Sequence, residues 1–201
     1  MPLARTLSYF LPVLFGSVLS TPVPGQTLVH KAGFAVWFVN TPDLNFLVRL
    51  EGDSIMPTDH PTIVAVDGTP VQIAVIATSK FTMATAPKKM LEDFFAYESG
   101  YMRETMSKDL AFHQEMLRLE NKQDALFWSY DMPKLEAVDP AREATGHLFL
   151  NTICKDYMIG LNIVLFAEDD PKKQKARLLR IANSLTLSDV PFTEAMIDAI
   201  H

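Results

Sequence analysis

The chain predicts an α+β domain, with a largely antiparallel sheet sandwiched by helices in an α/β/α arrangement. Three observations predict this class. Strand-like runs come first, and a long helical segment, four more strand-like runs and a second helix follow, whereas parallel βαβ units alternate more evenly. Asp67-Gly68 lies between two hydrophobic runs, which indicates an antiparallel hairpin. Both helical segments carry an apolar stripe at three- and four-residue steps, as helices that cover a sheet do.

The first third of the predicted domain consists of short strands. Residues 34–39 and 46–50 are rich in β-forming side chains. Residues 54–61 contain two prolines and scattered charge, so they predict a loop. Residues 62–66 and 71–77 are the two arms of the hairpin around Asp67-Gly68.

The long helix is predicted over residues 86–107, with Thr85 as its N-cap. Two strands follow, at residues 110–119 and 125–131, with a polar hairpin loop between them. Apolar residues change from even to odd positions along the first of these strands, which predicts a β-bulge near residues 114–116.

The C-terminal third predicts one more hairpin and two helices. Residues 133–143 read as a charged loop, and residues 145–154 and 157–167 as the two hairpin strands. The second of these strands is apolar on both faces, so it is expected at the centre of the sheet. A helix then starts at Asp169-Asp170-Pro171, because acidic residues and proline suit a first turn. A last short helix is expected over residues 193–200.

This order of elements resembles a known superfamily over residues 30–187. The resemblance is carried by Ala32-Gly33-Phe34-Ala35-Val36 with a following Pro42, the strand pair around Asp67-Gly68, the helix from Pro87, and the final hairpin that leads into Asp169-Asp170-Pro171. In this order and spacing the chain is similar to the Mog1/PsbP-like superfamily. The resemblance implies an α/β/α sandwich and an accessory, chaperone-like or binding role without catalysis, and several members are exported. It places no site residue here, because partners differ widely between members.

Residues 1–25 are interpreted as a signal peptide and linker, and residues 26–201 as a single α+β domain. Arg5 precedes an uncharged apolar run of about 13 residues, which is too short to span a bilayer. Small and turn-forming residues follow, with cleavage expected after Ser20 or after Gly25. The alternative is a retained N-terminal anchor. The main prediction is export to a periplasm or the medium, without stable membrane insertion once the leader is removed.

Composition and motifs argue against several functions. The net charge is −6 and no basic run occurs, so nucleic acid is not an expected partner. Cys154 is the only cysteine, so no internal disulfide is possible, and its apolar context predicts a buried thiol. The sequence has no glycine-rich phosphate loop, no paired Cys/His zinc pattern and no Gly-x-Ser-x-Gly elbow. We therefore expect no enzyme activity and no cofactor.

The candidate ligand-binding residues are apolar. Met102, Met106, Phe127 and Trp128 are predicted to line a groove for a small apolar ligand or a protein partner. Core filling is the alternative role for all four. Clustered methionines in an exported protein are also typical Cu(I) ligands, which is a further alternative for Met102 and Met106.

A metal site is the alternative to a binding protein. His113 and Glu115 are two apart on a predicted strand, so they share a face if no bulge intervenes. His147, on another strand, could supply a third ligand to a metal-dependent enzyme or a metal carrier. The main prediction remains an exported, non-enzymatic binding or accessory protein, whose oligomeric state the sequence leaves open.

Overall fold

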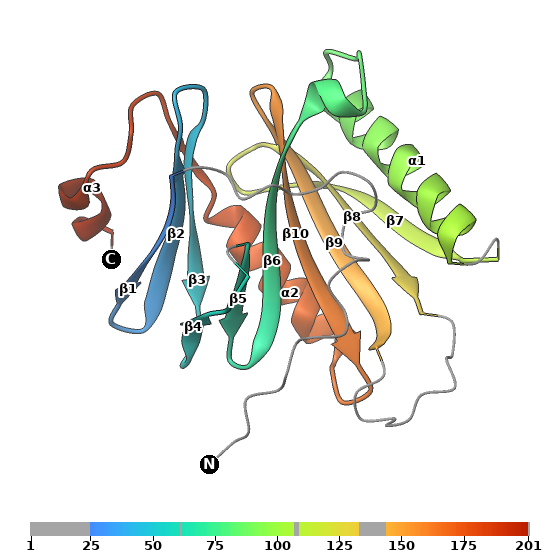
Figure 1. Ribbon diagram of the computed structural model, residues 1–201, viewed down its shortest axis with the longest axis horizontal. Helices are drawn as coiled ribbons and strands as arrows, with labels where there is room; N and C mark the ends of the chain where they lie inside the picture. Colours follow the sequence, from blue (N-terminus) through green and yellow to red (C-terminus); the bar gives the residue numbers. More distant parts are fainter. Residues whose placement is uncertain (1–24, 61, 107–108, 133–143, 201) are drawn as a thin grey trace.

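The computed structural model describes residues 25–60, 62–106, 109–132 and 144–200, and their strands form two antiparallel sheets (Figure 1). The smaller sheet has the order β1-β2-β3-β11. Its strands are β1 (Gln26–Lys31), β2 (Phe34–Asn40), β3 (Asn45–Glu51) and β11 (Thr186–Ser188). The α+β class and the antiparallel pairing are confirmed, but the strands are divided between two sheets instead of one.

The larger sheet has seven strands in the order β4-β5-β6-β10-β9-β8-β7. They are β4 (Ile55–Pro57), β5 (Ile63–Val66), β6 (Thr69–Ala77), β7 (Phe112–Arg118), β8 (Asp124–Asp131), β9 (Ala144–Cys154) and β10 (Tyr157–Phe166). β10 lies at the centre between β6 and β9, as its two apolar faces predict. Eight of its ten residues are buried, because both faces of the strand are covered.

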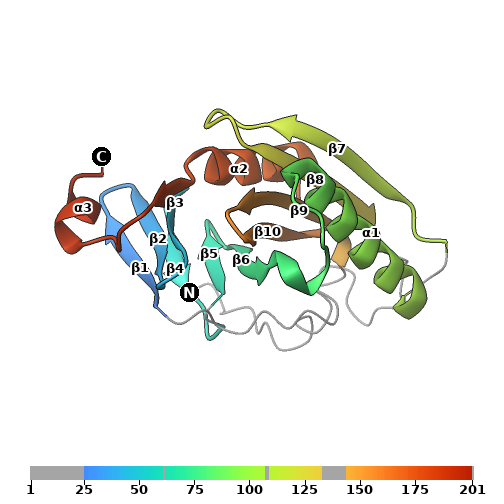
Figure 2. The same cartoon turned by 90° about the horizontal axis from the view of Figure 1, so that it is seen from above.

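Two helices cover opposite faces of the larger sheet. They are α1 (Pro87–Thr105) and α2 (Pro171–Asn183), and a short 3-10 helix, η2 (Thr78–Lys80), connects β6 toward α1. Leu91 and Phe94 of α1 pack in one core with Trp128 and Phe149 of the sheet. Leu178 of α2 packs in another core, on the opposite face. Figure 2 shows the smaller sheet at one end of the molecule and α1 at the other.

The core beneath α2 joins the two sheets. Trp37 and Phe46 of the smaller sheet belong to the same buried cluster as Ile73 and Leu161 of the larger sheet and Ile181 of α2. The rings of Trp37 and Phe46 are in contact, with centroids 5.6 Å apart. Both sheets therefore depend on one continuous hydrophobic core.

The outer face of the smaller sheet is covered by the C-terminal segment. Phe34, Val36 and Leu47 are buried there against Phe192 and against Ile197, which lies on the helix α3 (Glu194–Asp198). The Asn40 side chain holds this segment in place. Its Nδ2 donates to the Phe192 carbonyl at 2.9 Å, and its Oδ1 accepts from the Phe192 N–H at 2.8 Å.

The predicted hairpin turn at Asp67-Gly68 is confirmed and has a side-chain partner on α2. Asp67 has φ of 51° and Gly68 has φ of 76°, and a type I′ hairpin turn requires positive φ at both central positions. One Asp67 oxygen accepts from the Ser54 N–H at 3.0 Å, and the other accepts from Arg177 at 3.1 Å. The turn is thus tied to α2, although 110 residues separate Asp67 from Arg177.

Several local predictions are wrong. β4 forms within residues 54–61, which predicted a loop. β7 pairs with β8 in an unbroken register, so the bulge near residues 114–116 is absent. The N-cap of α1 is Ala86, which makes no side-chain cap, and not Thr85. The predicted leader up to residue 24 and the charged loop at residues 133–143 lie outside the described residues.

Candidate functional site

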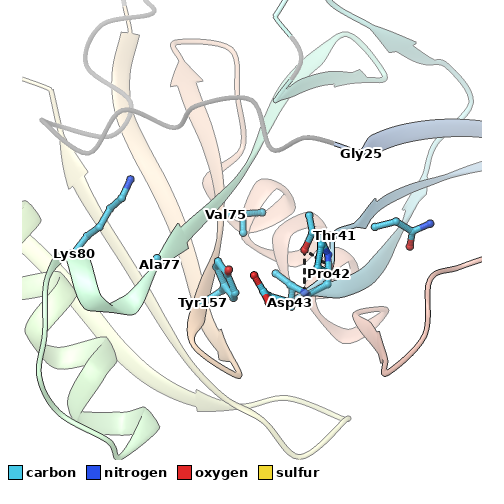
Figure 3. A pocket seen from close by; sticks show the side chains of 10 residues that line it. Gly25, Thr41, Pro42, Asp43, Val75, Ala77, Lys80 and Tyr157 are labelled. Atoms are coloured by element: carbon cyan, nitrogen blue, oxygen red, sulfur yellow. Dashed lines mark hydrogen bonds between the residues drawn. The ribbon is translucent and has the colours of Figure 1, made fainter.

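A pocket lies where the two sheets approach each other, between the β2–β3 loop and the start of β10 (Figure 3). Its volume is about 440 Å³, within the range of small-molecule sites. Apolar atoms come from Pro42, Leu44, Val75 and Ala77. The remaining lining residues are Gly25, Asn40, Thr41, Asp43, Lys80 and Tyr157.

The wall formed by the β2–β3 loop is fixed by short hydrogen bonds. The Thr41 hydroxyl accepts from the Leu44 N–H and donates to the Leu44 carbonyl, both at 2.9 Å. The Thr41 N–H also donates to the Leu44 carbonyl, at 3.0 Å. Asn40, at the start of this loop, is held by its two bonds to Phe192. Asp43 is therefore presented from a closed turn rather than from a long loop.

The opposite wall is formed by η2 and the first residue of β10. The Thr78 N–H donates to the Asp156 carbonyl at 2.8 Å, and the Thr78 hydroxyl donates to the same oxygen at 3.1 Å. These two bonds fix η2 against the β9–β10 turn. They bring Lys80 and Tyr157 to the same pocket, although 77 positions in the chain separate them.

Three polar side chains of this pocket have no partner within the described part of the chain. Asp43 and Lys80 are exposed and make no ion pair there, and the Tyr157 hydroxyl makes no hydrogen bond there. In Figure 3 the Asp43 carboxylate points toward Tyr157, while Lys80 lies on the far side of Tyr157. The pocket thus offers one negatively charged hydrogen-bond acceptor, one positively charged donor and one phenol hydroxyl.

Three of the four residues predicted to line an apolar groove lie in one core, and the fourth lies on the opposite face of the sheet. Met102 and Trp128 are buried beneath α1, and Met106 packs at the edge of the same core. Phe127 belongs to the other core, beneath α2, where Lys175 lies 4.3 Å above its ring centroid. Phe127 and Trp128 are consecutive on β8, so the pleat directs them to opposite faces.

The three residues proposed for a metal site are also separated by the sheet. His113 and Glu115 are exposed on β7, and Glu115 pairs with Lys175 of α2 at 2.6 Å. His147 is buried on the opposite face, where its ring stacks on Tyr130 with centroids 5.1 Å apart. Across the described residues, no group of three His, Cys, Asp or Glu side chains is arranged to hold a metal ion. These three residues therefore do not form one site.

Burial withdraws the Cys154 thiol and the His147 imidazole from solvent. Cys154 is 1% exposed, and desolvation raises the pKa of its thiol to about 12. His147 is 3% exposed, and desolvation lowers the pKa of its imidazole to about 4. At neutral pH the thiol is protonated and the imidazole is uncharged.

His147 belongs to a buried polar cluster beneath α1, together with Tyr130 and Glu98. Burial, with a smaller contribution from the Glu98 charge, raises the pKa of Tyr130. The Tyr130 hydroxyl and His147 Nδ1 have no hydrogen-bond partner among the described residues. Nearby, Trp128 Nε1 donates to Asn151 Oδ1 at 2.7 Å, while Asn151 Nδ2 has no hydrogen-bond partner among the described residues.

The fold and the pocket define a small α+β protein with two antiparallel sheets and a preformed cavity between them. Among solved structures, the chain is similar to cyanobacterial PsbP (CyanoP) from Synechocystis sp. PCC 6803, with 14% identity and a TM-score of 0.38. The similarity covers 86% of this chain and 98% of that chain. No family model and no curated protein matches the chain.

The pocket was missed by sequence reasoning because its residues come from four distant segments. Residues 40–43 indicate a turn and Lys80 indicates a surface position, but neither pattern indicates a cavity. Among the described helices, none combines the length and the hydropathy that a membrane span requires.

Proposed function

We propose that this chain is an exported, non-enzymatic binding or accessory protein that holds its ligand in the pocket between the two sheets. The observation that carries the proposal is the pocket itself. A cavity of about 440 Å³ has walls fixed by hydrogen bonds and three polar groups free to contact a ligand. A few convergent polar groups over an apolar lining are typical of sites that bind small molecules.

The non-enzymatic part of the proposal is supported by where the reactive side chains lie. A nucleophilic thiol and a titrating imidazole must reach substrate, and Cys154 and His147 are both buried. The free groups of the pocket are one carboxylate, one ammonium and one phenol on separate elements. This set suits recognition of a ligand by charge and shape.

Export is supported by the leader-like sequence, and the fold favours one of its two cleavage positions. The Gly25 carbonyl accepts from the Asn40 N–H at 3.2 Å, and Gly25 lines the pocket with φ of +84°. Cleavage after Gly25 would remove this residue from the site. We therefore expect the exported protein to begin at Thr21, and mass spectrometry of the exported chain tests this against a start at Gln26.

The binding role is tested by an NMR screen of the full chain against a mixed library of small amines, carboxylic acids, dipeptides and neutral aromatic compounds. Binding is expected to shift the amide signals of Thr41, Leu44 and Ala77. An Ala77→Phe variant fills the pocket and should abolish these shifts. The matched control is Ala111→Phe, which places the same ring at an exposed position outside the pocket and should retain them.

Two results would overturn the binding role. One is a library that moves no pocket amide in the folded protein. The other is a set of compounds that bind equally well to the Ala77→Phe variant, because binding would then occur elsewhere.

A further inference from the structure

The two free charges of the pocket have opposite sign and come from opposite walls. Asp43 is presented by the β2–β3 turn and Lys80 by η2, and Val75, Ala77 and Tyr157 also line the space (Figure 3). Neither charge is neutralised by another side chain in the described ranges. A ligand with a single charge would leave one of them unused.

We infer that the pocket binds a short peptide-like zwitterion, with the ligand ammonium at Asp43 and the ligand carboxylate at Lys80. This inference rests on the proposed binding function and adds the chemical class of the ligand. A carboxylate accepts hydrogen bonds from an ammonium, and the lysine ammonium donates to a carboxylate, so both contacts are charge-assisted. The Tyr157 hydroxyl can form a hydrogen bond with the ligand amide group that lies between the two charges.

The size of the cavity matches two residues. Two extended residues span about 7 Å, so a dipeptide holds its two terminal charges apart, as the two walls hold Asp43 and Lys80 apart. A single α-amino acid carries both charged groups on one carbon atom and cannot spread them in this way. A volume of about 440 Å³ also leaves room for one apolar side chain against Val75 and Ala77.

The test uses three forms of one dipeptide, alanyl-leucine. The first form is unmodified, the second is N-acetylated and lacks the ammonium, and the third is C-amidated and lacks the carboxylate. Affinity for the full chain is measured by NMR titration of the Thr41 and Ala77 amides. The unmodified dipeptide is expected to bind about fivefold more tightly than either blocked form, the difference that one exposed ion pair supplies.

Charge-matched variants assign each end of the ligand. Asp43→Asn should weaken the unmodified and amidated forms about fivefold and leave the acetylated form unchanged, because only the first two carry the ammonium. Lys80→Met should weaken the unmodified and acetylated forms and leave the amidated form unchanged. The controls Asp59→Asn and Lys173→Met remove the same charges at exposed positions outside the pocket and should change none of the three affinities.

The outcomes separate this inference from the binding role on which it rests. Equal affinity for all three forms, or affinities that Asp43→Asn leaves unchanged, would overturn the zwitterion while the pocket remains a binding site. Failure of every compound in the library, the dipeptides included, to move a pocket amide would overturn both.

Discussion

The imidazole of His147 is buried in an environment that water does not reach. Its neighbours are aromatic, because the ring stacks on Tyr130 and lies 5.9 Å from the centroid of Phe149. Protonation would place a positive charge in this core. The native packing beneath α1 therefore requires the uncharged form of the imidazole.

This burial predicts a stability that falls with acid. The pKa of His147 is lowered from its ordinary value of 6.5 to about 4, so the unfolded chain binds the proton more readily than the folded chain. The stabilisation is present above pH 6.5 and is lost progressively as the pH falls from 6.5 to about 4. Between about pH 7.5 and pH 5, the free energy of unfolding should decrease by about 2 kcal/mol through this residue. Urea unfolding at the two pH values measures the decrease.

The same experiment on His147→Phe should show that decrease removed, because phenylalanine has no proton to bind. The exposed His113→Phe variant is the matched control and should keep the pH dependence of the parent chain. An unchanged pH dependence in His147→Phe would contradict the assignment to this residue.

Single residues also show what the sequence could and could not predict about the site. Phe127 and Trp128 are adjacent on one strand, and side chains alternate between the two faces of a strand. The sequence alone therefore predicts that these two residues lie on opposite faces. The face of the sheet on which His147 lies relative to His113 could not be predicted in this way, because it depends on the registers of β9 with β8 and of β8 with β7. One sequence does not contain those registers, so a site shared by His113, Glu115 and His147 could not be tested from it.

At the level of elements, the two long helices begin in different ways. Asp170 caps α2, since its carboxylate accepts from the Lys172 N–H at 2.9 Å. Ala86 precedes Pro87 at the start of α1 and makes no side-chain cap. The end of α1 that lies near the pocket wall therefore lacks one stabilising bond.

This difference predicts opposite effects for two substitutions. Ala86→Asp should raise the free energy of unfolding by about 0.5–1 kcal/mol, because the new carboxylate can accept from a first-turn N–H. Asp170→Ala should lower it by about 1 kcal/mol. Urea unfolding at neutral pH measures both, and a destabilised Ala86→Asp variant would contradict this account of the α1 terminus.

Elements were predictable where their signals were long or strong. α1, the Asp67-Gly68 hairpin and the central β10 follow from periodicity, turn chemistry and apolar content. β4 and β11 have three residues each, too few to establish any period. β7 suggested a bulge because it is half exposed, with Phe112 and Met116 packing under α1 while Leu117 packs on the other side.

For the molecule as a whole, the shared core predicts that both sheets unfold together. The chain has two tryptophans, and Trp37 lies in the smaller sheet while Trp128 lies in the larger sheet. In the variants Trp37→Phe and Trp128→Phe, the remaining tryptophan reports on one sheet alone. In each variant, the fluorescence transition in urea should coincide with the far-UV circular dichroism transition. Two separated transitions would show that the smaller sheet is an independent unit.

The division of the strands into two sheets could not be predicted from the sequence, and the reason is physical. β1 has no fully buried residue and no strict alternation of exposed and half-buried positions, so it carries a weak strand signal. The choice of partner for β3, which pairs with β11 from the far end of the chain, is a contact across 135 or more residues. Local patterns predict strands and turns, but they do not predict which strands assemble into which sheet.

The segment after β11 has a practical consequence for anyone who shortens this chain. Ending the polypeptide at Ser188 would strip Phe192 and Ile197 from the smaller sheet and leave Phe34, Val36 and Leu47 facing water. An exposed apolar surface of this kind promotes aggregation. Residues 189–200 thus protect the protein from aggregation by covering this surface.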